Sequence, residues 1–384
     1  MEEILIRAYL RLLANPDVGA AKLSRALVKF GSLQNITRQP IQGLQQQRVS
    51  KTFLSTIHSA LQQNRHHTFD RACDESLAWA EGEKRQLIVY ESANYPLLLR
   101  NISTPPPLLF AEGDCNLLHS PICAFVGSRR ASDYGLRHSE WFAHELAEAG
   151  FTIASGLAKG IDGAAHKGAL SATGKTIGVI GTGIDRIYPS SNKKLFDRLR
   201  QEGLVLSEFP LGAPPRSAHF PQRNRIISGI SLGTVVIEAT LRSGSLITAR
   251  LAMEQNRDVF AVPGPIDRAN AQGCHKLLQE GAKLVMSAED IGVELVQGWG
   301  SGKVTMANKH CQQRDKAGSR TKKVSESLSS IEQRLIAAIS EHDMLFDSIV
   351  AATNLPVSTV NSTLLELESK GLVTNSAGRV GLVQ

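Results

Sequence analysis

Short apolar runs alternate with amphipathic stretches in the middle of the chain. Residues 132–149 and 245–255 have helical spacing, which places helices between the apolar runs. Near-continuous apolar strands separated by helices are typical of a parallel sheet that is buried on both faces. With right-handed crossovers, this pattern predicts an α/β fold with a Rossmann-like, doubly wound parallel sheet. The predicted strands span residues 122–126, 151–154, 176–180, 204–206, 234–237, 259–262 and 283–286.

The N-terminal part has a different pattern. Residues 1–85 predict a small all-α domain, in which Leu23, Leu27 and Phe30 recur at helical spacing after a turn at 15–19. Two interpretations remain open: a DNA-binding helix-hairpin-helix (SAM-like) unit, or a plain helical bundle that packs on its neighbour. Residues 86–300 form the Rossmann-like domain, which begins with one strand and a proline-rich extended connector.

The C-terminal part is predicted to contain a linker and a second module. Residues 301–328 are poor in apolar side chains and predict a basic flexible linker. Residues 329–384 predict a winged helix, with helices at 331–339, 347–352 and 358–370 and a hairpin at 372–383.

The net charge suggests a nucleic-acid partner, but the charge is unevenly distributed. The 384 residues carry a formal net charge of +7, of which +6 lies in residues 301–325. Residues 326–384 sum to −4, so docking to a partner or self-association is favoured over direct DNA reading for the winged helix. A DNA site in the Rossmann-like domain must therefore arise from charges that cluster in space.

The remaining composition narrows the setting. Five cysteines are spread without CxxC spacing, so neither a metal site nor a disulfide framework is expected. The acidic start Met1-Glu2-Glu3 lacks the basic segment of a signal peptide, and no run of about 18 uncharged apolar residues occurs. We therefore expect a cytoplasmic protein with no membrane partner.

Glycines, small hydroxyls and basic side chains follow the predicted strands at the points where the strands end. Glycine permits close backbone approach, and hydroxyls and helix N-termini favour anions. Because parallel strands end at one edge of a sheet, these loops predict an extended phosphate-binding rim. Neither GxGxxG nor Walker A occurs, so no dinucleotide, ATP or other cofactor is expected. The candidate residues are Gly127, Ser128, Arg129, Ser155, Gly156, Lys159, Gly160, Lys193, Phe220, Arg223, Asn224, Arg225, Ser243, Gly244 and Ser245.

Seven strings of residues recur in one order along the middle of the chain. They are GSR at 127–129, SGLAKGIDGAAH at 155–166, GTG at 181–183, SEF at 207–209, FPQRNRII at 220–227, RSGSL at 242–246 and AVPG at 261–264. Together these strings resemble the DNA-processing protein A (DprA/Smf) family, and the resemblance covers roughly residues 86–290. The resemblance implies a homodimeric single-stranded DNA-binding protein, without catalytic residues, that protects incoming DNA and helps to load the RecA recombinase during natural transformation.

The resemblance also implies roles for individual residues. Arg129 would hold a backbone phosphate in a pocket lined by Ser155, Gly156, Lys159 and Gly160. A guanidinium group suits this role because it can bind phosphate through two hydrogen bonds.

Residues 219–225 are expected to form a loop after the fourth strand, and here the interpretations stay open. Phe220 either stacks on a base or belongs to the core. Arg223 and Arg225 both contact phosphate, or one faces the pocket while the other pairs with Glu208 or Glu238.

Three nearby residues have plainer interpretations. Asp162 is expected to cap a helix N-terminus, and His166 to be packed in the core. Tyr188-Pro189 is expected to form a turn rather than to stack on a base.

An enzymatic alternative is a Rossmann-like nucleotide phosphoribohydrolase. Such enzymes use a strand-end glutamate as acid or base, and Glu238 occupies a comparable position. The Pro-Gly-Gly-x-Gly-Thr loop of that family is absent, since Ser231-Leu232-Gly233-Thr234 stands in its place. Release of free base from a nucleoside monophosphate distinguishes the two hypotheses.

Overall fold

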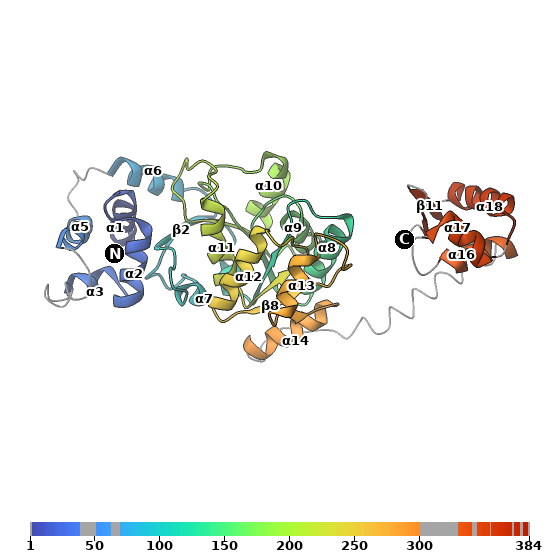
Figure 1. Cartoon of the computed structure of the whole chain (residues 1–384). Helices are drawn as coiled ribbons and strands as arrows, with labels where there is room; N and C mark the ends of the chain where they lie inside the picture. Colours follow the sequence, from blue (N-terminus) through green and yellow to red (C-terminus); the bar gives the residue numbers. More distant parts are fainter. Residues whose placement is uncertain are drawn as a thin grey trace. The chain divides into compact units, whose positions relative to one another are not determined.

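The computed structural model describes residues 2–38, 51–62, 70–299, 329–339, 344–353, 355–370, 372–376 and 379–382. The chain divides into two compact units, residues 1–306 and 307–384 (Figure 1). The predicted linker at 301–328 lies outside the described residues. In the part of the chain that is described, no helix combines the length and apolar character needed to cross a membrane.

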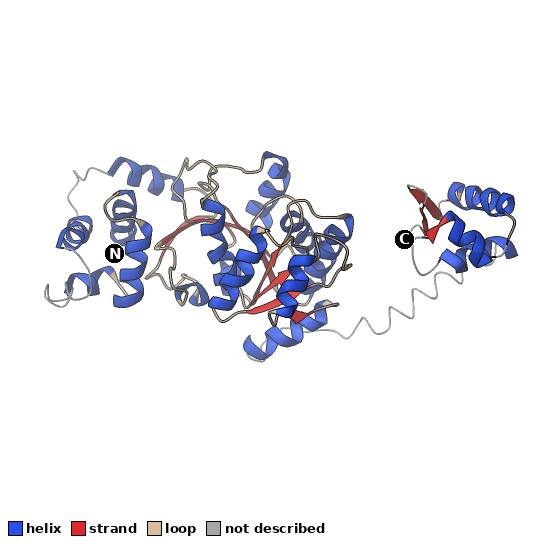
Figure 2. Cartoon of the chain, viewed as in Figure 1, coloured by secondary structure: helices blue, strands red, loops and turns tan. Residues whose placement is uncertain are grey.

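A nine-stranded sheet lies at the centre of the first unit, between helices on its two faces (Figure 2). Its strand order is β1-β2-β6-β5-β4-β3-β7-β8-β9. Strands β3 to β9 are parallel, which confirms the predicted Rossmann-like sheet. These strands are β3 (Ile122–Val126), β4 (Thr152–Ser155), β5 (Thr176–Val179), β6 (Leu204–Ser207), β7 (Gly233–Val236), β8 (Asp258–Ala261) and β9 (Lys283–Leu284).

Two antiparallel strands extend the sheet beyond β6. Strand β1 (Arg85–Val89) pairs with β2 (Leu108–Gly113), and β2 pairs with β6. The sequence pattern indicated one strand and a connector here, and it missed β2. The β2 run is fully buried, and in the sheet it lies between β1 and β6.

Alternate strand residues point into two apolar layers, as strand geometry requires. In β3, Ala124 and Val126 pack into one layer, whereas Cys123 and Phe125 pack into the other. The first layer receives α10 (Lys193–Glu202), α11 (His219–Ile230), α12 (Gly244–Glu254) and α13 (Gln272–Gln279). The second receives α8 (Asp133–Glu148), α9 (Ile161–Ser171) and α14 (Ala288–Trp299).

The described N-terminal elements are helices that pack against the β1 edge. The Tyr9 hydroxyl donates a hydrogen bond to Glu91 at 2.8 Å, and the Leu33 amide donates to the same carboxylate oxygen at 2.8 Å. Their apolar side chains are continuous with the first layer. The division of the chain into a separate domain at residues 1–85 stays a prediction. The elements are α1 (Glu2–Ala14), α2 (Ala20–Phe30), α3 (Leu33–Arg38), α5 (Lys51–Leu61) and α6 (Asp70–Ala80).

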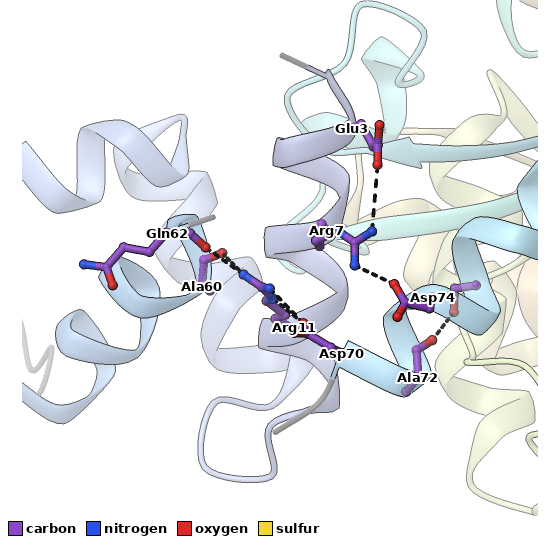
Figure 3. A network of polar contacts seen from close by, with 9 residues as sticks. Glu3, Arg7, Arg11, Ala60, Gln62, Asp70, Ala72 and Asp74 are labelled. Atoms are coloured by element: carbon purple, nitrogen blue, oxygen red, sulfur yellow. Dashed lines mark hydrogen bonds and ion pairs between the residues drawn. The ribbon is translucent and has the colours of Figure 1, made fainter. Parts of the chain in front are cut away.

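Charged contacts connect α1 to α5 and α6 (Figure 3). The buried Arg11 donates to Asp70 at 2.8 Å and to the Gln62 carbonyl at 2.8 Å. Arg7 donates to Asp74 at 2.6 Å. Both arginines of α1 are thus engaged with groups of the neighbouring segments.

The second unit is a winged helix, as predicted. Its apolar core contains Leu335, Ile349, Val360, Leu367 and Val380. A short strand that the sequence pattern missed, β10, pairs with the second strand of the hairpin. The elements are α16 (Ser330–Ile339), β10 (Met344–Leu345), α17 (Phe346–Thr353), α18 (Val357–Ser369), β11 (Val373–Ser376) and β12 (Arg379–Leu382).

Candidate nucleic-acid interface

A cavity of about 810 Å³ opens at the carboxyl ends of the parallel strands. It lies where the strand order reverses, since β3 pairs with β4 on one side and with β7 on the other. Ligands of doubly wound sheets bind at this position. Of the predicted site residues, the cavity brings together Gly127, Ser128, Arg129, Phe220, Arg223, Asn224, Ser243, Gly244 and Ser245.

The loops after β3 and β4 hold each other at the cavity rim. The Ile161 amide donates to the Ser128 carbonyl at 3.2 Å, and the Ser128 amide donates to the Glu238 carbonyl at 2.7 Å. Gly160 has a φ of +77°, and a Cβ atom there would lie 2.2 Å from the Ser128 oxygen. Only glycine permits this approach, so Gly160 shapes the rim without lining the cavity.

Arg223 brings a buried positive charge to the cavity. It is 4% exposed, and its Nη2 donates to the Gly156 carbonyl at 3.0 Å. A Cβ atom on Gly156 would lie 1.6 Å from Nη1 of Arg223, so the glycine makes room for the guanidinium. Burial lowers the pKa of Arg223 to about 10. Its Nε has no hydrogen-bond partner in the described part of the chain, which is costly for a buried donor.

Asp162 does not serve as the predicted helix cap. Gly160 occupies the cap position of α9, and Asp162 lies inside the first turn. Its carboxylate accepts from the Gly156 amide at 3.2 Å, which fixes the loop after β4. Burial raises the pKa of Asp162, while the charge of Arg223 opposes that change.

An exposed arginine and two aromatic rings separate this cavity from a smaller one of about 230 Å³. The Arg129 guanidinium carbon lies 5.2 Å from the centre of the Phe220 ring, and the Tyr188 ring lies 5.6 Å from it. Arg129 forms no ion pair with any described residue. Lys159 and Gly156 line the smaller cavity.

Tyr188 lines the site, although the sequence favoured a turn over a base-stacking role for Tyr188-Pro189. It precedes a cis proline and is 43% exposed, and its ring lines both cavities. The available signal was an aromatic residue in a strand-end loop, next to a residue that favours turns.

The start of α12 is a second feature of the cavity that favours anions. Ser243 caps this helix, and its Oγ accepts from the Ser245 amide at 3.3 Å. A helix N-terminus carries partial positive charge and unpaired N–H groups. Both serines and Gly244 line the cavity, so this end of the helix faces the same space as Arg129.

Besides Gly160, three predicted residues line neither cavity. The Ser155 hydroxyl is buried and donates to the Phe125 carbonyl at 2.6 Å. Arg225 pairs with Glu208, at the side of α11 away from the cavity. Lys193 is exposed at the start of α10.

The segment expected as a loop at 219–225 is the beginning of α11. This correction explains which arginine faces the cavity. Arg223 lies three residues after Phe220 and shares its face of the helix, whereas Arg225 lies five residues after it. Pro221 is tolerated because it stands in the first helical turn.

Glu238 and His166 are engaged in structural contacts. Glu238 accepts from the Ser132 amide at 2.9 Å and from the Ser132 hydroxyl, and it does not line the cavity. His166 is fully buried, and its Nδ1 lies 2.7 Å from the Thr176 hydroxyl. Burial lowers the pKa of His166 to about 3, so the imidazole is neutral.

These features define a Rossmann-like protein with a cavity lined by arginines and a helix N-terminus at the switch point of its sheet. The profile of DNA recombination-mediator protein A matches residues 86–296, and that of the DprA winged helix domain matches residues 319–379. Protein Smf of Synechocystis is 37% identical over 313 residues, which are 76% of this chain and 79% of that protein.

Two solved structures are also similar. DNA processing protein A of Streptococcus pneumoniae matches with a TM-score of 0.62 at 38% identity, over 76% of this chain and 95% of that chain. A DNA processing protein A of Helicobacter pylori, described for its single-stranded DNA binding mode, matches with a TM-score of 0.51 at 32% identity. The latter match covers 56% of this chain and 97% of the other. The chain belongs to the DNA-processing protein A (DprA/Smf) family.

Proposed function

We propose that this chain binds single-stranded DNA in the switch-point cavity, protects incoming DNA and helps to load RecA during natural transformation. The observation that carries the proposal is the buried guanidinium of Arg223, which lines both cavities together with Arg129. A phosphate would accept hydrogen bonds from this group and offset part of the cost of burying its charge. The Helicobacter pylori relative, which binds single-stranded DNA, supports the choice of ligand.

In this mechanism, the phosphate lies between the two arginines and the start of α12. Arg129 leaves the Phe220 ring to hold the phosphate from outside, and Arg223 holds it from beneath. The vacated Phe220 face then accepts a base, with Tyr188 beside it. Stacking of a base on an aromatic side chain contributes about 1–3 kcal/mol.

Selectivity for the single strand follows from the same geometry. A base can reach Phe220 only if it is unpaired, and the stiff backbone of a duplex cannot follow a narrow cavity. Lys159 lines the smaller cavity, and Asn192 donates to the Ala158 carbonyl at 3.1 Å, which places Lys193 beside the same loop. These lysines add a salt-sensitive contact to the strand as it leaves the cavity.

We include RecA loading and a homodimer in the proposal only because the resemblance to the family implies them. A dimer would hold two strand segments and favour the meeting of complementary strands. RecA loading is tested by measuring RecA filament assembly on a coated single strand, with and without this protein. Acceleration supports the loading role, and an unchanged rate limits the function to DNA binding.

The phosphoribohydrolase alternative is not favoured by the position of Glu238. Its carboxylate already accepts hydrogen bonds from Ser132 and does not face the cavity. We expect no release of free base from nucleoside monophosphates by the full chain. Release that disappears in Glu238→Gln would restore the enzymatic hypothesis.

The binding proposal is tested by fluorescence anisotropy of a labelled single strand and of its duplex, at several salt concentrations. The wild type should prefer the single strand. Arg129→Ala should lose about 1.5–3 kcal/mol, because charge-assisted hydrogen bonds are removed. The matched control is Arg137→Ala, an exposed arginine of α8 that lines neither cavity. Equal binding of both DNA forms, unaffected by Arg129→Ala, would place the DNA site elsewhere, with the basic residues 301–325 as the next candidate.

A further inference from the structure

We infer that the segment at the end of β6, Ser207-Glu208-Phe209, holds α11 in the orientation that presents Phe220 and Arg223 to the cavity. We name these three residues the support segment. Glu208 of this segment and its partner Arg225 of α11 are positioning residues that do not touch DNA. The inference rests on the proposed function, because its readout is the affinity for single-stranded DNA.

The first contact is a buried ion pair. Nη2 of Arg225 donates to Oε2 of Glu208, and the two side chains are 13% and 4% exposed. Neither residue lines either cavity. Arg225 lies five residues after Phe220, which places it about 140° away around the helix. The ion pair therefore holds α11 on the side that faces away from the cavity.

The second contact is an aromatic stack at the first turn of the helix. The rings of Phe209 and His219 are stacked, with centroids 4.0 Å apart and an interplanar angle of 18°. The Ser207 hydroxyl donates to the Thr182 carbonyl at 2.6 Å and accepts from the Phe209 amide at 3.0 Å. These bonds fix the support segment to the loop after β5.

The stack at His219 and the ion pair at Arg225 lie six residues apart on α11. Phe220 and Arg223, which face the cavity, lie between these two contacts. Removing one charge of the pair leaves the other buried without its counter-charge, and α11 must shift to hydrate it. Arg223 then moves relative to the Gly156 carbonyl, which is 3.0 Å from its Nη2. A small displacement is enough to break this contact and to weaken phosphate binding.

Positioning and direct contact predict opposite outcomes for two single variants. If Arg225 only positions the helix, Arg225→Gln and Glu208→Gln should each weaken single-strand binding, by about fivefold or more, because a shift in α11 breaks charge-assisted hydrogen bonds. The dependence of log K on log salt should keep its slope, because no phosphate contact is lost. If Arg225 touched phosphate, its loss would reduce that slope by about 0.7, and Glu208→Gln would strengthen binding by removing a negative charge.

The double variant Glu208→Gln/Arg225→Gln adds a further test. Positioning through one pair predicts that it binds no more weakly than the worse of the two single variants. The matched control is Glu202→Gln, which removes an exposed carboxylate paired with Arg198 on α10 and should leave affinity unchanged. Thermal unfolding followed by circular dichroism confirms that each variant is folded at the assay temperature.

A charge-neutral variant keeps the inference testable should Glu208→Gln not fold. Phe209→Leu removes the stack on His219 and changes no charge, so it should also weaken binding at an unchanged salt slope. Folded support-segment variants that bind as tightly as the wild type would overturn the inference while leaving the proposed function intact. A wild type without single-strand preference would instead refute the proposed function.

Discussion

Gly156→Ala is the smallest perturbation that removes Arg223 from the cavity. The added Cβ would lie 1.6 Å from Nη1 and 2.4 Å from Cζ of Arg223, so the guanidinium cannot stay. Gly156 itself has no positive φ, so the backbone tolerates alanine and the effect falls on Arg223. Because Arg223 is 4% exposed, its side chain cannot move into solvent unless α11 rearranges.

The magnitude follows from the contacts that are lost. A hydrogen bond from a charged donor contributes about 1.5–3 kcal/mol, and the variant loses the phosphate contact that we assign to Arg223. This corresponds to a loss of about ten- to a hundredfold in affinity for single-stranded DNA. Overpacking adds a cost of about 1–3 kcal/mol to the free energy of unfolding.

The assay is an anisotropy titration of labelled single-stranded DNA, together with urea unfolding of the same preparations. Gly163→Ala is the matched control: it adds the same methyl group seven residues along the chain, where the nearest atom lies 3.3 Å away. The control should bind within about twofold of the wild type, since helix-interior Gly→Ala changes stability by only about 0.5–1 kcal/mol. A folded Gly156→Ala protein with wild-type affinity would refute the assignment of Arg223 to the binding site.

Three further outcomes follow from the structure. Phe220→Leu should weaken single-strand binding by about 1–3 kcal/mol through the loss of base stacking, and anisotropy with an abasic strand should show a smaller difference. Gly160→Ala should lower the free energy of unfolding by more than the roughly 1–2 kcal/mol of a left-handed residue, because its Cβ would also collide with the Ser128 oxygen; an unchanged urea midpoint would contradict this. The unfolded chain protonates His166 near its ordinary pKa of 6.5, whereas the folded chain does so only near about 3. Stability should therefore fall as the pH drops from 6.5 towards 3, and His166→Gln should reduce that slope in urea unfolding measured across the range.

The sheet was accessible from the sequence because its strands are buried on both faces. Runs such as 122–126 are apolar without alternation, and only a covered parallel strand places every side chain in a core. Strand β2 was missed because it follows three prolines and joins the sheet by antiparallel pairing with β6, a partner almost a hundred residues away. Local pattern contains no information about such a partner.

The sequence also predicted which edge of the sheet holds the candidate site, but it did not predict the role of each residue there. The strand-end loops meet because parallel strands end together, and this placed Gly127, Arg129 and Gly156 near one another. Ser155 fits the same pattern, yet its hydroxyl is used inside the sheet. Whether a strand-end hydroxyl faces a loop or a neighbouring strand depends on its side of the strand and on what packs there.

By itself, the sequence determined the parallel sheet, the winged helix, the family, and the loops that surround the cavity, because each depends on periodicity or on local strings of residues. Only the tertiary structure decided which of Arg223 and Arg225 faces the cavity. Both are arginines of one segment, and each could bind phosphate equally well. The glycine at 156 opens a space beneath one of them, and Glu208 lies beside the other. The burial of a side chain and its contacts depend on how the whole chain packs. For this reason Arg223 faces the cavity, whereas Arg225 pairs with Glu208.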